Sequence, residues 1–229
     1  MGTLDYRQTN IAIVLAVAAA IVGALLGGPW IWLHYLCKPL ATLLVLSLAV
    51  RAVPAQSPRY RAAVVVGVVL SLAGDVLLML PQDLFVPGLV AFLLAHLCFI
   101  VAFFPGARLP ARLLALLVYG IVGAANMALL LPKIPPPLHA PVLAYVVVLV
   151  VMASLAAARA WSLRNDATLA RPALLAAWGG ALFILSDSLL AWDRFGGGLP
   201  LSPLLVLASY YAALWCIARS VGVREETVQ

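Results

Sequence analysis

Charged side chains are scarce in this chain of 229 residues: 10% are Asp, Glu, Lys or Arg, whereas 66% are hydrophobic. The mean hydropathy of +1.12 is more than a water-soluble domain of this length can hide in its core. The sequence therefore predicts an integral membrane protein of the all-α class. It leaves no room for a separate soluble domain, and we expect residues 1–229 to form one membrane domain.

Cysteine and histidine are also rare, with three of each: Cys37, Cys98, Cys216, His34, His96 and His139. An odd number of cysteines scattered through apolar runs does not predict a disulfide framework. The histidines are not spaced as metal ligands, and a zinc hydrolase needs a tighter cluster. We therefore expect neither a metal nor another cofactor.

Long hydrophobic runs are the main feature that the chain does have. Eight of them occur, at about 11–28, 31–50, 61–80, 84–104, 111–131, 138–159, 171–193 and 200–220. Each is close to the roughly 20 residues that a helix needs to cross a bilayer, and Gly- and Pro-rich turns separate them. Open strands cannot face lipid. The prediction is a polytopic bundle of about eight transmembrane helices.

Basic residues are distributed unevenly between the two sets of predicted loops. Eleven of the 14 lie at the termini or near the loops after the second, fourth and sixth spans: Arg7, Arg51, Arg59, Arg61, Arg108, Arg112, Arg159, Arg164, Arg171, Arg219 and Arg224. By the positive-inside rule, both termini are expected to be cytoplasmic. Topology then accounts for the net charge of +6, and no nucleic-acid partner is expected.

Two aspartates, Asp75 and Asp187, lie inside predicted spans. A carboxylate at the bilayer centre costs about 2.5–3.5 kcal/mol on insertion scales, so such a residue is a functional candidate by default. Lys38, Asn126 and Tyr145 fall at a similar depth, within about 10 Å of the outer boundary at 1.5 Å per residue. We therefore expect a polar pocket that opens toward the non-cytoplasmic side, with His96 and Tyr210 somewhat deeper.

Short motifs surround these polar residues. They are Gly74-Asp75 in the run 72–80, then Phe85, Gly88, Phe92 and His96, the segment Ser186-Asp187 through Ala191, and Lys38-Pro39. In order and spacing the chain resembles the YhhN-type membrane proteins, the lysoplasmalogenase family, over nearly its whole length. One departure is that Leu214 follows Tyr210-Tyr211-Ala212-Ala213, where the family often has a glutamine.

The resemblance implies a hydrolase that cleaves the vinyl ether bond of lysoplasmalogens to a fatty aldehyde and a glycerophospho-alcohol. A vinyl ether is labile to acid, so this chemistry needs one protonated carboxyl group and one ionised carboxylate, as glycosidases do for a related cation. We hypothesise that Asp75 and Asp187 are the catalytic pair, without assigning which of them is the acid. The implied partners are a lysophospholipid substrate and the bilayer; a homodimer stays open. The expected location is the inner membrane of a bacterium.

Substrate-binding or orienting roles are hypothesised for the remaining polar residues: Lys38, His96, Asn126, Tyr145, Ser186, Arg194 and Tyr210. Lys38 or Arg194 is a candidate for holding the lipid phosphate, and Lys38 for keeping an aspartate ionised. Purely structural readings stand beside these, as interhelical hydrogen bonds or a serine bonded back to its own helix. A Ser-His-Asp set of Ser186 or Ser188 with His96 and Asp75 is a weaker interpretation, because no nucleophile elbow is present.

Other functions also fit a membrane bundle with buried ionisable residues. A proton-coupled transporter uses the same residue types in its relays. Hydrolysis of another lyso-lipid, or a non-catalytic lipid-binding or assembly role, also remains open. A polar layer displaced to one side of the membrane favours the hydrolase, because alternating access is expected to use a site near the midplane.

Overall fold

The computed structural model describes residues 5–223, and Arg224 lies outside them. Eight long helices follow one another: α1 (Tyr6–Leu26), α2 (Ile31–Val50), α3 (Pro58–Met79), α4 (Phe85–Phe103), α5 (Leu109–Leu130), α6 (His139–Ser162), α7 (Ala170–Phe195) and α8 (Ser202–Arg219). Short 3-10 turns connect some of them: η1 (Gly28–Trp30), η2 (Leu131–Lys133) and η3 (Pro136–Leu138). All eight helices are long and apolar enough to cross a membrane. The prediction of eight spans is confirmed, and the protein is an integral multi-pass membrane protein.

The helix ends differ from the predicted spans by a few residues. The largest difference is at the first span, which was expected from residue 11 but begins at Tyr6. The Asp5 N–H donates to the Gln8 side chain at 3.2 Å, and the Thr9 N–H donates to the Asp5 carbonyl at 2.9 Å. Hydropathy misses this first turn because its residues are polar, although their hydrogen bonds make it helical.

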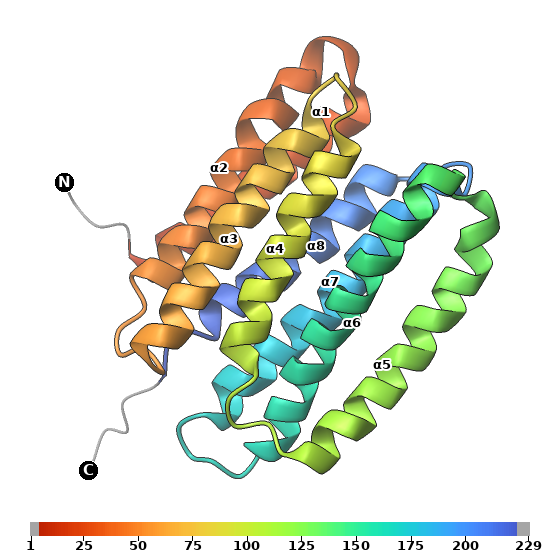
Figure 1. Ribbon diagram of the computed structural model, residues 1–229. Helices are drawn as coiled ribbons and strands as arrows, with labels where there is room; N and C mark the ends of the chain where they lie inside the picture. Colours follow the sequence, from red (N-terminus) through yellow and green to blue (C-terminus); the bar gives the residue numbers. More distant parts are fainter. Residues whose placement is uncertain (1–4, 224–229) are drawn as a thin grey trace.

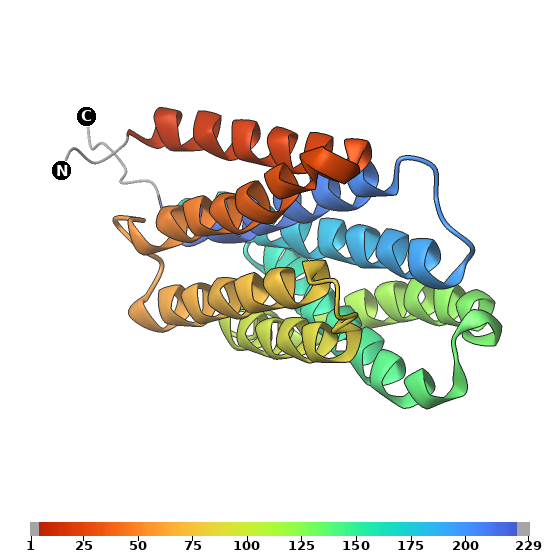
Figure 2. The same ribbon diagram turned by 90° about the horizontal axis from the view of Figure 1, so that it is seen from above.

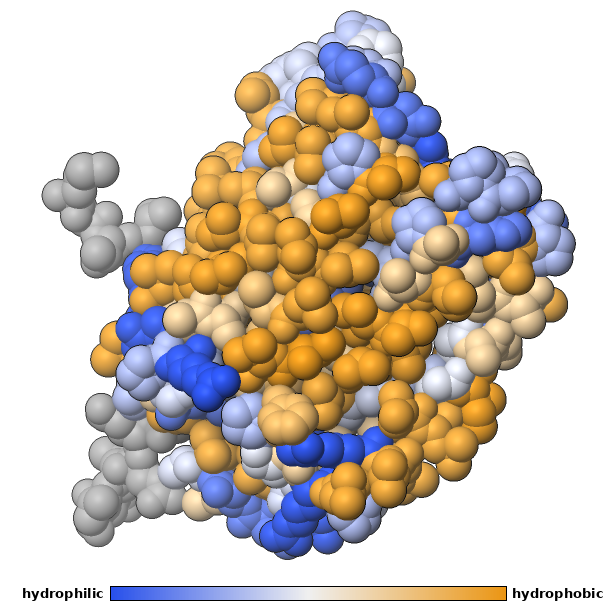
Figure 3. All heavy atoms as spheres, viewed as in Figure 1, coloured by the Kyte–Doolittle hydropathy of each residue, from blue (hydrophilic) through white to orange (hydrophobic). Residues whose placement is uncertain are grey.

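The helices alternate in direction, so that the start of α1 and the end of α8 lie at one end of the bundle (Figure 1). The loops that carry most of the basic residues lie at this same end, and we call it the basic end. It comprises residues 51–57, 104–108 and 163–169 with the ends of the adjoining helices. Figure 3 shows hydrophobic residues across the middle of one face, with hydrophilic residues gathered toward its ends. This is the pattern of a surface that lies in lipid.

Helix α8 passes through the interior, against α1, α2, α3 and α7, whereas α5 lies at the edge beside α6 (Figures 1 and 2). The difference follows from the side chains. Ten residues of α8 are buried, among them Tyr210, Tyr211 and Leu214. Only Met127 and Leu130 of α5 are buried, and both lie in its last turn. The outer face of α5 is therefore available to lipid along most of its length.

Glycine allows α3 and α4 to approach each other closely. A Cβ added at Gly67 would lie 2.3 Å from Cε1 of Phe99, a residue with no exposed surface. We expect Gly67→Ala to lower the free energy of unfolding by about 1–3 kcal/mol, because overpacking a closed core forces neighbours to move. Gly120→Ala is the matched control, since a Cβ there meets nothing within 4 Å. Thermal unfolding in detergent measures both, and equal midpoints for the two variants would contradict the packing argument.

Candidate active site

A cavity of about 320 Å³ lies in the half of the bundle opposite the basic end. All eight helices contribute to its wall, and most of the lining side chains are apolar. Six of the nine predicted site residues line it: Lys38, Asp75, Asn126, Tyr145, Asp187 and Tyr210. Two carboxyl groups from distant parts of the sequence therefore face one cavity within the membrane.

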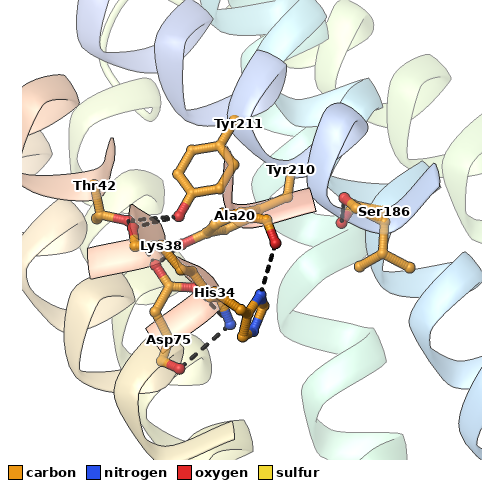
Figure 4. Close-up of polar contacts among 9 residues, drawn as sticks. Ala20, His34, Lys38, Thr42, Asp75, Ser186, Tyr210 and Tyr211 are labelled. Atoms are coloured by element: carbon orange, nitrogen blue, oxygen red, sulfur yellow. Dashed lines mark hydrogen bonds and ion pairs between the residues drawn. The ribbon is translucent and has the colours of Figure 1, made fainter. Parts of the chain in front are cut away.

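Asp75 lies at the centre of a buried polar cluster between α2, α3 and α8 (Figure 4). Its Oδ1 lies 3.3 Å from Nζ of Lys38. Its Oδ2 accepts hydrogen bonds from the Thr42 hydroxyl and from the Tyr210 hydroxyl, each at 2.7 Å. Asp75 is 1% exposed and Lys38 7%. Every group around this carboxyl donates to it, which is the environment of an ionised carboxylate.

Helix geometry assembles this cluster. Lys38 and Thr42 are four residues apart on α2, so both side chains lie on the same face. Tyr211 supports them from α8: its hydroxyl donates to the Lys38 carbonyl at 2.6 Å and lies 3.2 Å from Oγ1 of Thr42. We did not predict Thr42 or Tyr211 as site residues. The i, i+4 spacing from Lys38 was the available signal for Thr42, whereas Tyr211 had none beyond its neighbour Tyr210.

Asp187 belongs to a second cluster, formed by α4, α6 and α7. Its Oδ2 accepts a hydrogen bond of 2.5 Å from the Tyr145 hydroxyl, and Nε2 of His96 lies 2.9 Å from that hydroxyl oxygen. The single tyrosine proton is directed to Asp187, so His96 must donate from Nε2 to Tyr145. The ring proton of His96 is therefore on Nε2. Nδ1 of His96 is buried and has no hydrogen-bond partner among residues 5–223.

The two carboxyl groups differ in what surrounds them. Asp187 has no lysine or arginine within 4 Å among the described residues; Nε2 of the His96 imidazole lies 3.6 Å from its Oδ2. No hydrogen bond reaches its Oδ1 from that part of the chain, and its side chain is 15% exposed. Both oxygens of Asp75 have partners, and its side chain is 1% exposed. One oxygen of Asp187 is therefore free to meet a reacting group.

Aromatic rings separate the two clusters. The Phe183 ring lies 4.8 Å from the His96 ring and 5.6 Å from the Tyr210 ring, measured between centroids. Phe92 also packs edge-on against Tyr210, at 5.8 Å. The two aspartates share no hydrogen-bond partner among the described residues. They can therefore hold different protonation states while facing the same cavity.

Asn126 connects α5 to α7 near the end of α5 that lies opposite the basic end. Its Nδ2 donates to the Ser188 hydroxyl at 2.8 Å, and its Oδ1 accepts from the Trp192 indole at 2.7 Å. These two bonds fix the orientation of the amide. Asn126 thus forms interhelical hydrogen bonds, one of the roles considered for it from the sequence. These bonds hold α5 in place as part of the cavity wall.

The other three predicted site residues, His96, Ser186 and Arg194, are not part of the cavity lining. The Ser186 hydroxyl donates to the Val206 carbonyl on α8 at 3.2 Å, so it joins two helices and does not bond within its own (Figure 4). Nη2 of Arg194 donates to both carboxylate oxygens of Asp83, at 2.8 and 2.9 Å, on the exposed outer surface. Its guanidinium lies 4.5 Å from the Phe85 ring.

His96 contacts Tyr145 and Asp187, and neither Ser186 nor Asp75 is among its partners. The geometry therefore gives no Ser-His-Asp arrangement of these residues. Among residues 5–223, no three His, Cys, Asp or Glu side chains come together as metal ligands would.

Comparison with known proteins identifies relatives over most of the chain. The model of the YhhN family matches residues 33–221. Lysoplasmalogenase TMEM86B of Sus scrofa is 34% identical over 198 residues, 84% of this chain and 76% of that protein. Lysoplasmalogenase of Mycobacterium bovis is 35% identical over 190 residues, 79% of this chain and 68% of that protein.

The human relative gives a shorter match. Lysoplasmalogenase TMEM86B of Homo sapiens is 35% identical over 152 residues, which are 66% of this chain and 60% of the human protein. The match thus spans less than two thirds of the human protein's length. No solved structure matches the chain significantly.

Proposed function

The chain belongs to the YhhN family, and from that premise we propose that it hydrolyses the vinyl ether bond of a lysoplasmalogen. One observation carries the proposal beyond the names of the relatives. Two carboxyl groups with unequal hydrogen-bond partners, Asp75 and Asp187, line one largely apolar cavity inside the membrane. A lipid with an acid-labile bond is the substrate class that such a cavity suits.

Asp187 is the proposed general acid. Its carboxyl group transfers a proton to the β-carbon of the alkenyl chain, and the electron pair of the C=C bond forms the new C–H bond. The positive charge that develops is shared between the α-carbon and the ether oxygen. The free Oδ1 of Asp187 provides the position from which a proton reaches that carbon, and Tyr145 holds Oδ2. His96 positions Tyr145 through the hydrogen bond from its Nε2 to the Tyr145 hydroxyl.

Asp75 is the proposed ionised partner. Lys38, Thr42 and Tyr210 all donate to it, so it faces the cavity as a carboxylate and stabilises the oxocarbenium ion. A water molecule then adds to the α-carbon and gives its proton to the Asp187 carboxylate. Asp187 returns that proton to the glycerol oxygen as the hemiacetal C–O bond breaks, and the hemiacetal hydroxyl gives its own proton to the Asp187 carboxylate as the aldehyde C=O bond forms. Fatty aldehyde and glycerophospho-alcohol leave, and both aspartates end in their starting states.

The apolar part of the wall suits the hydrocarbon chain of the substrate. Four apolar residues line the cavity on the basic-end side of the contact that Asn126 makes with α7. They belong to α5, α6 and α7: Val122, Val146, Val150 and Ile184. This side of the cavity lies next to α5, the helix with the most lipid-facing surface. A lysolipid chain that lies along these residues places its polar end toward Asp187 and Asp75.

Substitution of Val122 tests whether the hydrocarbon chain of the substrate lies along this wall. Val122 is 50% exposed and lines the cavity, so a tryptophan there fills chain space without disturbing the buried core. We expect Val122→Trp to raise KM about tenfold for a long-chain substrate, equivalent to losing about two buried CH₂ groups at ~0.8 kcal/mol each. A short-chain substrate is expected to show little change. Leu117→Trp is the control, because Leu117 lies on α5 but not in the cavity wall. Equal effects of both variants on both substrates would show that the hydrocarbon chain of the substrate does not lie against Val122.

The direct test of the proposed function is aldehyde release by the purified protein in detergent. A vinyl-ether lysophospholipid, the matching ester and the matching saturated ether are offered in parallel. We expect aldehyde from the vinyl ether alone, because only that bond forms an oxocarbenium ion on protonation at carbon. Fatty acid from the ester would indicate a different lysolipid hydrolase. No turnover by the folded protein would favour a transporter or binding protein.

We further propose that the termini face the cytoplasm and that the protein resides in the inner membrane of a bacterium. The support is the gathering of arginines at the basic end, as the positive-inside rule expects of cytoplasmic loops. The cavity with both aspartates then lies toward the non-cytoplasmic side. Cysteine labelling from either side of the membrane, at exposed loop positions such as Val53 and Asp83, tests this orientation.

A further inference from the structure

A second cavity lies at the basic end, remote from the two aspartates. Its volume is about 110 Å³, and α3, α4, α6 and the residue before α7 contribute to it. The polar side chains in its wall are Gln56, Ser57, Arg59, Tyr60 and Arg159. No acidic side chain belongs to this wall. The cavity is therefore lined by cations and neutral groups.

Arg159 is the unusual member, because its charge is buried with no carboxylate of residues 5–223 within 4 Å. The residue is 5% exposed and lies in the last turn of α6. Its Nε donates to the Pro105 carbonyl at 3.1 Å, and its Nη2 donates to Oε1 of Gln56 at 2.5 Å. The guanidinium also lies 5.1 Å from the Tyr60 ring. All of these partners are neutral.

The guanidinium also has unused hydrogen-bonding capacity. Nη1 of Arg159 is buried and has no partner in residues 5–223, and no carboxylate there lies within 4 Å of the guanidinium. Asp166, the acidic residue that interacts with it at longer range, is partly exposed. The Asp166 carboxylate accepts from the Leu169 and Thr168 N–H groups at 2.8 and 3.0 Å, and these bonds lower the pKa of Asp166. A buried charge without a partner is costly, and an anion in the cavity would compensate it.

Two further features of the wall favour an anion. Arg59 is exposed at the start of α3 and forms no hydrogen bond or ion pair within the described residues. Ser57 and Leu169 are the N-cap residues of α3 and α7, so two helices direct their positive ends to this region. These dipoles support the site, but the buried guanidinium with an unpaired donor is the observation on which it rests.

We propose that this cavity binds a phosphate group, with Arg159 as the buried cation and Arg59 as the cation at the entrance. A water molecule occupies about 30 Å³ of liquid, so the cavity holds a group of a few non-hydrogen atoms and not a whole phospholipid. The phosphate belongs either to the head group of an anionic lipid or to a free phosphate ion. This site is separate from the proposed hydrolytic cavity and does not rest on the proposed activity.

Binding here would stabilise the basic end of the bundle. Gln56, which accepts from Arg159, also donates to the Ser220 carbonyl after α8, and Tyr60 bonds the Ser220 hydroxyl at 2.8 Å. Arg159 in turn holds the Pro105 carbonyl after α4. The anion would thus neutralise the charge at a point where α3, α4, α6 and α8 are joined.

Thermal unfolding of the purified full-length protein tests the proposal. In detergent, inorganic phosphate is titrated against chloride at constant ionic strength. In parallel, the protein is placed in nanodiscs of phosphatidylcholine with or without phosphatidylglycerol. We expect a saturable rise of a few degrees in Tm with one of the two probes, as ligand linkage requires. A rise with free phosphate identifies an ion site, and a rise with phosphatidylglycerol only identifies a lipid head-group site.

Three variants decide whether the effect belongs to this cavity. Arg159→Gln is expected to abolish the rise in Tm and Arg59→Gln to reduce it. Arg164→Gln is the matched control: Arg164 is exposed at the same end, does not line the cavity, and donates to the Trp161 carbonyl at 2.8 Å. If Arg159→Gln does not fold, the exposed Arg59 still provides the test. No rise in the wild type with either probe, or a rise unchanged in Arg59→Gln, would overturn the proposal.

Discussion

Asp187→Asn is expected to reduce aldehyde release about a hundred- to ten-thousand-fold, the range that general acid–base catalysis contributes. An asparagine fills the same space and can still accept the hydrogen bond from Tyr145, but it has no carboxylic acid proton to transfer to carbon. The fold should remain, since α7 keeps its contacts through Ser186, Ser188 and Trp192. The measurement is the initial rate of aldehyde formation, with Tm recorded for each variant.

Asp83→Asn is the matched control for this experiment. Asp83 is an aspartate at the same end of the bundle, but it is exposed and its carboxylate pairs with Arg194 outside the cavity. Its loss should leave the rate within about twofold, because exposed ion pairs contribute little. Asp75→Asn should also lower the rate strongly, by removing the charge that stabilises the cation. If Asp75→Asn and Asp187→Asn both keep full activity in folded protein, the carboxyl pair is not the catalyst.

Lys38→Met is the second change with a large expected effect, in this case on stability. The substitution removes the cation 3.3 Å from Asp75 and leaves a carboxylate that is 1% exposed. Breaking a buried ion pair by removing one partner costs about 3–5 kcal/mol of the free energy of unfolding. The Thr42 and Tyr210 hydroxyls continue to donate to Asp75, so the protein is expected to be weakened but not fully unfolded.

The double variant Lys38→Met/Asp75→Asn separates loss of the charge partner from loss of packing. With both charges removed, the unpaired buried charge disappears, and the double variant should be more stable than Lys38→Met alone. Reversible unfolding of the single and double variants in mixed micelles measures the coupling between the two sites. The single variant Asp75→Asn gives the reference for this comparison. If the double variant is less stable than Lys38→Met by the same amount that Asp75→Asn alone costs the wild type, the two residues are not coupled.

The eight spans could be predicted because hydrocarbon imposes length and composition on every helix. The two aspartates, Lys38 and Tyr145 could be found because polar residues in an apolar run are conspicuous. Side-chain contacts between different helices could not be predicted from the hydropathy of the sequence. Hydropathy gives the depth of a residue but not the rotation of its helix. Thr42 and Tyr211 were therefore missed as partners of the Lys38–Asp75 pair.

The same limit explains why Ser186 and Arg194 do not line the cavity. Ser186 precedes Asp187 in the sequence, but adjacent helical residues point about 100° apart, and Ser186 turns toward α8. Arg194 lies seven residues after Asp187 on the same side of α7, yet it reaches the outer surface, where Asp83 offers a bidentate partner. Asp83 follows a turn whose position relative to α7 is set by tertiary packing alone.

The fate of the transferred proton tests the central claim most directly. Hydrolysis of a vinyl-ether lysolipid is run in D₂O, and the aldehyde is reduced at once to the alcohol so that its α-hydrogens cannot exchange. If Asp187 protonates the alkenyl carbon within the cavity, one deuterium enters on one face only, and the product is a single enantiomer at that carbon. A racemic product would mean that carbon is protonated in solution, and would contradict carboxyl-catalysed protonation in this cavity.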